Sequence, residues 1–281
     1  MIKSAAARAF SSVSVTKEGM VAKVTLEKPV MGFGFWNDFH EAVTSVSRDP
    51  ATRCVVLSSA SKVFSFGLDV KDAKQIELLT GKDIDAARKA DTLRRFLLHF
   101  QSAFTVMETA PPVISCVHSF CIGGAMDLIC ATDIRYCTKD ASFSIKEVDV
   151  GLAPDLGTLQ RIERIVKSSS LVRELAFTGR QMDSNEALSC GFVSRVFNTK
   201  QEMLDAANEL ANVIASKSPV AISGIKANLN YARGRSVEQS LEYQALWSSA
   251  ALQSVDVETG LHAAANVKTA PKTTFQNLTK Y

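Results

Sequence analysis

The sequence lacks the features of a disulfide-bonded, metal-binding or membrane-spanning protein. Its 281 residues include six cysteines, none of them in a C-x-x-C pair, and its four histidines lie in no recognisable partner motif for a cysteine nucleophile. Buried, reduced thiols of an intracellular protein are the simpler explanation, with a Cys/His nucleophile pair as the alternative. The apolar runs are far shorter than the roughly 20 residues of a membrane span. We therefore expect no metal and no membrane partner.

The charge balance gives no reason to expect a nucleic-acid partner. The formal net charge is +3, which is small, although it mildly favours an anionic small molecule. Hydrophobic residues make up 46% and charged residues 22% of the chain, as in ordinary globular enzymes. A chain of this length can bury a substantial core without disulfides or a structural metal.

The N-terminus is poor in acids. No Asp or Glu precedes Glu18, while Lys3, Arg8 and several Ser and Ala are present. This composition predicts a mitochondrial targeting segment, which we place at residues 1–11. A frayed terminus that happens to lack acids is the alternative. The C-terminal Leu278–Tyr281 is not an S-K-L-type peroxisomal address, so the mitochondrial matrix is favoured over the peroxisome.

Strand and helix patterns alternate along residues 12–200, which predicts an α/β domain. From residue 201 onward the pattern is helical and contains no strand, so residues 201–281 form a second region. Such a region serves either assembly or the capping of its own domain. The expected strands lie within Ser12–Leu26, on both sides of Glu18-Gly19, and at Cys54–Ser58, Val113–Val117, Ile134–Cys137 and Phe143–Ile145. The expected helices of the first region include residues 35–46, 93–104, 124–131, Leu156–Val166 and a helix between a capping box at Asp183/Glu186 and Gly191. Those of the second region are 203–214, Pro219–Arg233 and Ser236–Ala265.

Two glycine-containing turns follow predicted buried strands. The first is Phe64–Val70 and the second is Cys121–Asp127, whose paired glycines open a helix. Glycine allows a tight turn with an outward backbone N–H, and a helix N-terminus adds free N–H groups and a positive dipole end. Two such groups from separate loops would form an oxyanion hole. Plain turn chemistry is the alternative for each segment taken alone.

Three acids lie in a very apolar neighbourhood: Asp127, Glu147 and Asp155. Asp127 comes one helical turn after Gly124, so it should project near the same mouth. Asp155 could instead cap the Leu156–Val166 helix, and Glu147 could be a solvated partner of Lys146.

These segments together resemble the crotonase (enoyl-CoA hydratase/isomerase) superfamily. The resemblance extends over residues 62–70, 116–162, 174–197 and 216–241, in the order and spacing of the family. It implies a ClpP-like α/β spiral of ββα units with a C-terminal helical trimerisation region, assembled as homotrimers or hexamers. It also implies an acyl-CoA thioester substrate and no cofactor, because CoA is part of the substrate.

The resemblance assigns roles to individual residues. The N–H groups of Leu68 and Gly124 would form the oxyanion hole. Hydratases of the family carry two glutamates at the positions of Asp127 and Glu147, whereas the Asp/Glu/Asp set that includes Asp155 is the pattern of the Δ3,5-Δ2,4-dienoyl-CoA isomerases of unsaturated fatty acid β-oxidation. We expect Glu147 to deprotonate C2, Asp155 to protonate C6 and Asp127 to orient or tune Glu147, because one carboxylate cannot easily reach both carbons.

Substrate binding is expected at Lys28, Phe66, Asp69 and Gly123. The family's Arg/Lys-Asn-Ala segment, which grips CoA, is replaced here by residues 27–32 without Asn-Ala, so Lys28 is either a phosphate contact or a solvated lysine.

Other functions remain open at this level. An enoyl-CoA hydratase or a Δ3,Δ2-enoyl-CoA isomerase on the same fold is the first alternative, and a catalytically silent scaffold is another. Some relatives bind RNA through a basic helix, and a segment with Arg88, Lys89, Arg94 and Arg95 could do so, although Asp83, Asp85 and Asp91 favour a solvated face.

Overall fold

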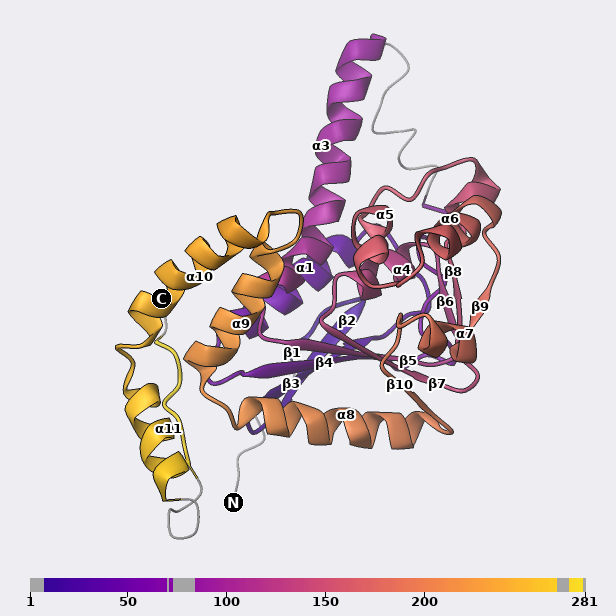
Figure 1. The fold of residues 1–281 in the computed structure, drawn as a ribbon. Coiled ribbons are helices and arrows are strands. Elements are labelled where there is room, and N and C mark those ends of the chain that lie inside the picture. The colour runs from indigo at the N-terminus through magenta and orange to yellow at the C-terminus, as the bar shows by residue number, and fades with distance from the viewer. Residues whose placement is uncertain (1–7, 70, 73–83, 267–272, 280–281) are drawn as a thin grey trace.

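The computed structural model describes residues 8–69, 71–72, 84–266 and 273–279, and these build two β-sheets wrapped by helices (Figure 1). The larger sheet has seven strands in the order β1-β2-β3-β4-β5-β7-β10. Strands β1 to β3 pair antiparallel, and β3 through β10 pair parallel. Its strands are β1 Arg8–Ala9, β2 Val13–Glu18, β3 Val21–Leu26, β4 Cys54–Ser59, β5 Val113–Val117, β7 Ile134–Thr138 and β10 Arg195–Phe197.

The second sheet contains β6 (Phe120–Ile122), β8 (Ser142–Ser144) and β9 (Met182–Asp183), in that order. The chain repeatedly leaves the large sheet, adds a strand to the small one and then enters a helix, as in β5-β6-α4. Ser65, after β4, makes a bridge to Cys121 of β6, so the first repeat follows the same path. This succession is the expected spiral of ββα units.

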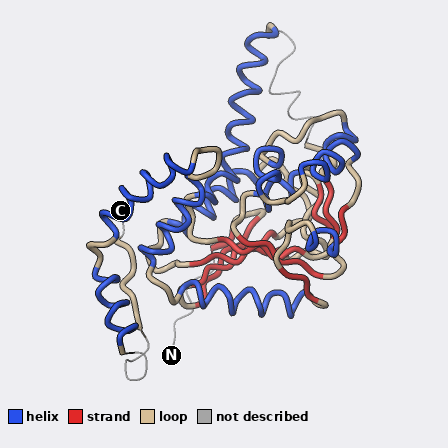
Figure 2. Tube along the Cα trace, in the orientation of Figure 1, coloured by secondary structure: helices blue, strands red, loops and turns tan. Residues whose placement is uncertain are grey.

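Helices cover both faces of the large sheet. Helix α8 lies along one face, and α1, α4, the short helices and the C-terminal end of α3 lie on the other. The rest of α3 projects from the body, and α10 and α11 also extend away from it (Figures 1 and 2). The α-helices are α1 Phe35–Ser47, α3 Ala86–Thr105, α4 Gly124–Cys130, α5 Thr158–Arg161, α6 Ser169–Thr178, α7 Ser184–Ser189, α8 Lys200–Ala215, α9 Pro219–Tyr231, α10 Val237–Ala251 and α11 Val255–Ala265, and the 3₁₀ helices are η1 Val106–Glu108, η2 Glu147–Val150 and η3 Ile162–Arg164.

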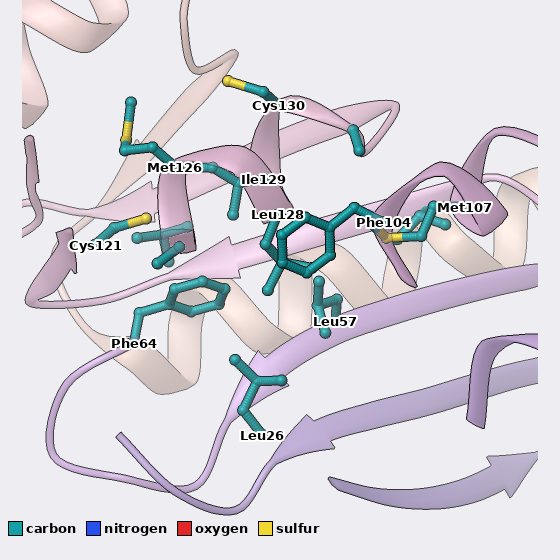
Figure 3. Close-up of a cluster of buried hydrophobic side chains, with 14 of the residues drawn as sticks. Leu26, Leu57, Phe64, Phe104, Met107, Cys121, Met126, Leu128, Ile129 and Cys130 are labelled. Atoms are coloured by element: carbon teal, nitrogen blue, oxygen red, sulfur yellow. The ribbon is translucent and has the colours of Figure 1, made fainter. Parts of the chain in front are cut away.

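The main core lies between the large sheet and the helices on the side opposite α8. Figure 3 shows Leu128 of α4 beside Phe104 of α3, with Leu57 of β4 below them, and Met126 and Ile129 of α4 belong to the same cluster. Helix α4 is buried along its whole length, so the position of its first turn is fixed by packing on several sides. This matters because α4 begins at the second glycine turn.

All six cysteines are buried and free, as predicted from their spacing. Burial raises the pKa of Cys54, Cys116, Cys130 and Cys137 to about 12. Thiolates are the reactive form, so these thiols are held in the inert one. The interpretation of a cysteine nucleophile is therefore wrong.

Most predicted elements are confirmed, but two predicted helices and one predicted capping box are wrong. Ser254 accepts a hydrogen bond from the amide of Asp256 at 3.1 Å and starts a new helix, so the expected Ser236–Ala265 helix is two, α10 and α11. The expected Leu156–Val166 helix is reduced to α5 and η3, because Gly157, at φ +125°, stands at its start. Asp183 caps α7, but the carboxylate of Glu186 pairs with Arg180 at 2.7 Å instead of completing a capping box.

The division into residues 1–11, 12–200 and 201–281 stays a prediction. Residues 8–9 of the expected targeting segment form β1 and pair with β2, while residues 1–7 lie outside the described residues, as does Asp83 of the basic segment.

A buried lysine ties the C-terminal helices to the spiral. The ammonium group of Lys226, on α9, donates to the carbonyl oxygens of Met107 and Pro111 and to the Asp133 carboxylate at 2.6, 3.3 and 2.7 Å. Asp133 also accepts the amide of Val113 at 2.8 Å, at the start of β5. One side chain thus joins α9 to η1 and to the residues just before β5 and β7.

We expect the Lys226→Ala substitution to lower the free energy of unfolding by about 3 kcal/mol, because it leaves a partly buried carboxylate and two carbonyl groups without their cation. Urea denaturation measures the loss. Lys217→Ala, which removes an exposed lysine near the same helix, is the control and should change stability by less than about 0.5 kcal/mol. Equal effects of the two substitutions would contradict the assignment.

Candidate active site

The two glycine turns meet. A Cβ atom added to Gly67, at φ +76°, would lie 2.6 Å from the carbonyl oxygen of Ile122 and 2.7 Å from the amide nitrogen of Gly124. A Cβ added to Gly124 would lie 3.7 Å from the amide nitrogen of Leu68. No side chain fits between these backbones, so glycine is required at the first position on both conformational and steric grounds. The contact brings the Leu68 and Gly124 amides together.

Neither of these two amides donates to another group within the described part of the chain. Their neighbours are fixed: the Asp69 amide donates to the Met31 carbonyl at 3.1 Å, and the Gly123 amide to the Ser144 carbonyl at 2.9 Å. Gly124 is the first residue of α4, where amides have no intrahelical acceptor. Two free, neighbouring donors on rigid elements are the arrangement that an oxyanion hole requires.

Asp127 lies on the first turn of α4 and is only 1% exposed. Its Oδ1 accepts the amide of Thr158 at 2.6 Å. Burial raises the pKa of Asp127 to about 6, and the negative charge of Asp155 acts in the same direction, while the hydrogen bond from Thr158 opposes it. The side chain therefore joins α4 to the turn that follows Asp155.

Glu147 begins η2, directly beside the second glycine turn. A Cβ added to Gly123, at φ +57°, would lie 3.3 Å from Oε1 of Glu147, so this glycine leaves space in front of the carboxyl group. Within the described residues, the buried Oε2 has no hydrogen-bond partner. Burial raises the pKa of Glu147 to about 7, with further contributions from the charges of Asp127 and Asp155. A partly buried carboxyl group with an unpaired oxygen and a raised pKa suits a general base.

The alternative explanations for two of the acids are wrong. Lys146 pairs with Asp149 at 2.6 Å, so Glu147 is not its solvated partner. The residue that caps α5 is Gly157, so Asp155 is not a helix cap. Asp155 lies at the exposed edge of the group, where local desolvation raises its pKa. Its charge acts on both of the other acids.

The three acids thus form one electrostatic group near the two free amides. Mutual repulsion disfavours the state in which all three are ionised, so the group retains a proton close to neutral pH. A bound proton beside an ionised carboxylate supplies an acid and a base in one site.

The residues expected to bind substrate differ in how they are placed. Phe66 is 47% exposed and stacks on Phe120 with ring centroids 5.8 Å apart, which makes a flat apolar surface next to Gly67. Asp69 accepts the amide of Lys71 at 3.0 Å and so stabilises its own turn. Lys28 is exposed on the segment after β3, which contacts this turn through the Phe66 amide and the Pro29 carbonyl, 2.7 Å apart. Val70 of the turn lies outside the described residues.

Two parts of this region escaped prediction. Met31 lies against Gly124, with Sδ 3.7 Å from an added Cβ, and an aromatic cluster joins Phe33 to Phe96 and Phe100 of α3 at centroid distances of 5.8 and 6.3 Å. The helical spacing of Phe96 and Phe100 was visible in the sequence, but nothing in it related them to Phe33. Contacts between distant segments leave no mark on local periodicity.

The basic segment forms the first turns of α3, and two of its arginines, Arg88 and Arg95, pair with neighbouring acids. Arg95 contacts Asp91 at 2.7 Å, and Arg88 contacts Asp85, the helix cap. This pairing is that of a solvated helix face. In the described ranges, no helix is long and apolar enough to cross a membrane, and no group of three or more His, Cys, Asp or Glu residues could hold a metal ion.

The spiral fold, the convergent amides and the adjoining acids define an enzyme of the enoyl-CoA hydratase/isomerase class. The family model described as enoyl-CoA hydratase/isomerase matches residues 16–271. The chain belongs to this family, and the fold agrees with a putative enoyl-CoA hydratase from Streptomyces coelicolor A3(2), with a TM-score of 0.83 at 24% identity over 98% of both chains.

Within the family, the chain is similar to proteins named dienoyl-CoA isomerase. It is 46% identical to the mitochondrial Delta(3,5)-Delta(2,4)-dienoyl-CoA isomerase of Rattus norvegicus, over 96% of this chain and 84% of the relative. It is 41% identical to the peroxisomal Delta(3,5)-Delta(2,4)-dienoyl-CoA isomerase of Arabidopsis thaliana, over 83% of this chain and 84% of that relative.

We expect Asp127→Asn to lower the pKa of Glu147 toward the usual glutamate range, because the substitution removes a negative charge that disfavours ionisation of Glu147. Titration of ¹³C-labelled glutamate by NMR, with Glu147→Gln to assign the signal, measures the change. Asp149→Asn is the control, since this exposed acid is paired with Lys146 and should leave the Glu147 titration unchanged. An unchanged pKa in Asp127→Asn would show that the two groups are independent.

Proposed function

We propose that the protein is a Δ3,5-Δ2,4-dienoyl-CoA isomerase. The observation that carries the proposal is the coupled set Asp127, Glu147 and Asp155 beside the amides of Leu68 and Gly124. The identity with relatives that bear this name supports it. Moving two conjugated double bonds requires a base at one end of the diene and an acid at the other, which a single carboxyl group does not provide.

In the proposed reaction, the thioester oxygen of the substrate accepts hydrogen bonds from the Leu68 and Gly124 amides. Glu147 removes a proton from C2, and the electron pair spreads over the diene and the thioester as a dienolate. The amides stabilise the negative charge on this oxygen. Loss of one such donor typically lowers the rate by about 10²–10³-fold. Asp155 then protonates C6, and the double bonds come to rest at C2 and C4.

The remaining acid and the binding residues have supporting roles in this proposal. Asp127 keeps the turn after Asp155 in place through the Thr158 amide and maintains the raised pKa of Glu147. The cycle closes when a proton returns from Glu147 to Asp155, so the reaction consumes nothing. It needs no metal and no cofactor, because CoA is part of the substrate. We place the acyl-CoA against Lys28, Phe66, Asp69 and Gly123, with Lys28 toward a CoA phosphate.

We place the protein in the mitochondrial matrix, in the oxidation of unsaturated fatty acids. The acid-free N-terminus and the mitochondrial names of several relatives support this location. One relative, from Arabidopsis thaliana, is named peroxisomal, so the location of this protein stays a proposal.

The proposal predicts that the purified protein converts a 3,5-dienoyl-CoA to the conjugated 2,4-dienoyl-CoA, measured by ultraviolet absorbance. Glu147→Gln and Asp155→Asn should each lower kcat by about 10³-fold or more, because each removes one end of the proton transfer. Asp149→Asn, an exposed acid between them in sequence, is the control and should keep wild-type kcat.

Two outcomes would contradict the mechanism. Near wild-type activity of Asp155→Asn would mean that the two-ended proton transfer is wrong. Strong hydration of crotonyl-CoA without diene transposition would identify a hydratase on the same fold.

We further propose that the C-terminal helices assemble the protein into trimers, paired into hexamers. Helices α9 and α10 present an unusually apolar surface in the single chain, with Leu229, Leu241 and Leu246 exposed to 66%, 63% and 71%. Monomeric proteins rarely leave so much contiguous apolar area in water.

Light scattering after gel filtration should therefore give the mass of three or six chains of 30.4 kDa each. Leu241→Glu should reduce that mass, because a charge placed in an apolar interface loses its solvation. Val213→Glu is the control: Val213 is 54% exposed on α8, whose buried face lies on the sheet, so this variant should keep the wild-type mass. A monomeric wild-type protein would refute the assembly.

A further inference from the structure

The turn that carries Asp155 is supported by a charged pair outside the acid group, Arg161 and Glu108. The guanidinium Nε and Nη2 atoms of Arg161 both donate to Glu108 Oε1, at 3.0 and 2.9 Å, and Nη2 also donates to Thr105 Oγ1 at 3.3 Å. The two side chains are 14% and 28% exposed. A guanidinium held by several acceptors in a partly shielded place has a fixed orientation, unlike most surface ion pairs.

The fixed guanidinium packs directly on the main chain of Gly157. A Cβ atom added to Gly157 would overlap Nη1 of Arg161 and lie 3.0 Å from its Cζ. Gly157 also has φ +125°, a conformation that side chains disfavour. The absence of a side chain at this position therefore serves two purposes: it permits the turn, and it lets the arginine contact the backbone.

Both acids on this side of the site depend on the same turn. The Thr158 amide donates to Asp127 at 2.6 Å, and the carbonyl oxygen of Asp155 accepts from Gln101 Nε2 of α3 at 2.7 Å. Gly157 lies between these two attachments. A shift of Gly157 would displace Asp155 relative to Asp127, and displacements of about 1 Å can cost 10²-fold in rate.

We propose that Arg161 is a positioning residue of the active site: anchored on Glu108 and packed on Gly157, it holds residues 155–158 so that Asp155 and Asp127 keep their relative places. The proposal rests on the proposed isomerase function for its catalytic consequence, but not for its structural one. The positive charge of Arg161 also lowers the pKa of Asp127, against the effect of burial.

The anchor itself is held by the C-terminal part of the chain. The main-chain oxygen of Glu108 accepts from Asn230 Nδ2 of α9 at 2.9 Å, and its carboxylate lies 3.5 Å from Arg233 Nη1. Arg233 shares the acceptor of Arg161, but the three atoms nearest to a Cβ added at Gly157 all belong to Arg161. It is therefore a matched control for loss of a cation beside Glu108.

The test compares Arg161→Gln, Arg161→Lys, Glu108→Gln and Arg233→Gln in the full-length protein. For Arg161→Gln we expect amide exchange at Thr158 to rise about tenfold or more. On a 3,5-dienoyl-CoA, kcat should fall about 10²-fold while KM changes by less than about threefold, because positioning affects the transition state and not binding. The pKa of Asp127, followed by NMR titration, should rise, since its carboxyl group loses a nearby cation.

The other variants separate charge from geometry. Arg161→Lys should restore the pKa of Asp127 but only part of kcat, because an ammonium group cannot reproduce the planar contact with Gly157. Glu108→Gln keeps the cation and weakens its anchor, so we expect an intermediate loss of kcat, and it carries the test if Arg161→Gln does not fold. Arg233→Gln should stay within about twofold of wild type.

Wild-type exchange at Thr158 together with wild-type kcat in both Arg161→Gln and Glu108→Gln would overturn the proposal. If the wild-type protein turns over no dienoyl-CoA, the proposed function fails by itself. The exchange rate at Thr158 then decides alone: faster exchange in Arg161→Gln than in Arg233→Gln supports the positioning role, and equal rates refute it.

Discussion

The site depends on the close approach of two main-chain turns, at Gly67 and at Gly124. Neither turn could hold this position alone, because each is a short connection. The small sheet provides the constraint: the Ser65 amide donates to the Phe120 carbonyl at 2.9 Å, and the Ile122 amide donates to the Ser65 carbonyl at 3.0 Å. These bonds fix one turn against the other. The amides that remain unpaired are then presented by rigid backbone, so no reorganisation is needed when charge develops on a bound oxygen.

The acids impose a cost that this framework has to offset. Asp127 is almost fully buried, and one oxygen of Glu147 is buried without a partner in the described chain. Unsatisfied buried carboxyl groups destabilise a fold, and they persist at sites where a raised pKa is useful. The structure around the acids is accordingly well packed and held by hydrogen bonds. Helix α4 is enclosed by the main core, and α9 is fastened through Lys226 to η1 and to the residues just before β5 and β7.

Local sequence patterns predicted the helices and strands better than the contacts between them. Alternating valines gave β2 and β3, and the spacing of Phe35, Phe39 and Val43 gave α1, because these signals lie within a few residues of one another. The glycine turns and the acids were found in the same way, and their family order indicated that they meet. The contact between Gly67 and Gly124, the hydrogen bond from Thr158 to Asp127 and the support by Arg161 involve residues far apart in the chain. The helix expected from Leu156 failed for a local reason, the backbone conformation of Gly157, which a sequence pattern does not express.

The six buried thiols are natural probes of local unfolding in this protein. Because each cysteine is buried and protonated in the folded chain, alkylating reagents and disulfides meet no reactive sulfur on it. The cysteines stand on β4, β5, β6, α4, β7 and directly after α7, so together they sample both sheets and the helix that opens at the glycine pair. Labelling at any one of them would therefore report the opening of that particular layer, and the order in which the six become labelled would trace how the spiral comes apart.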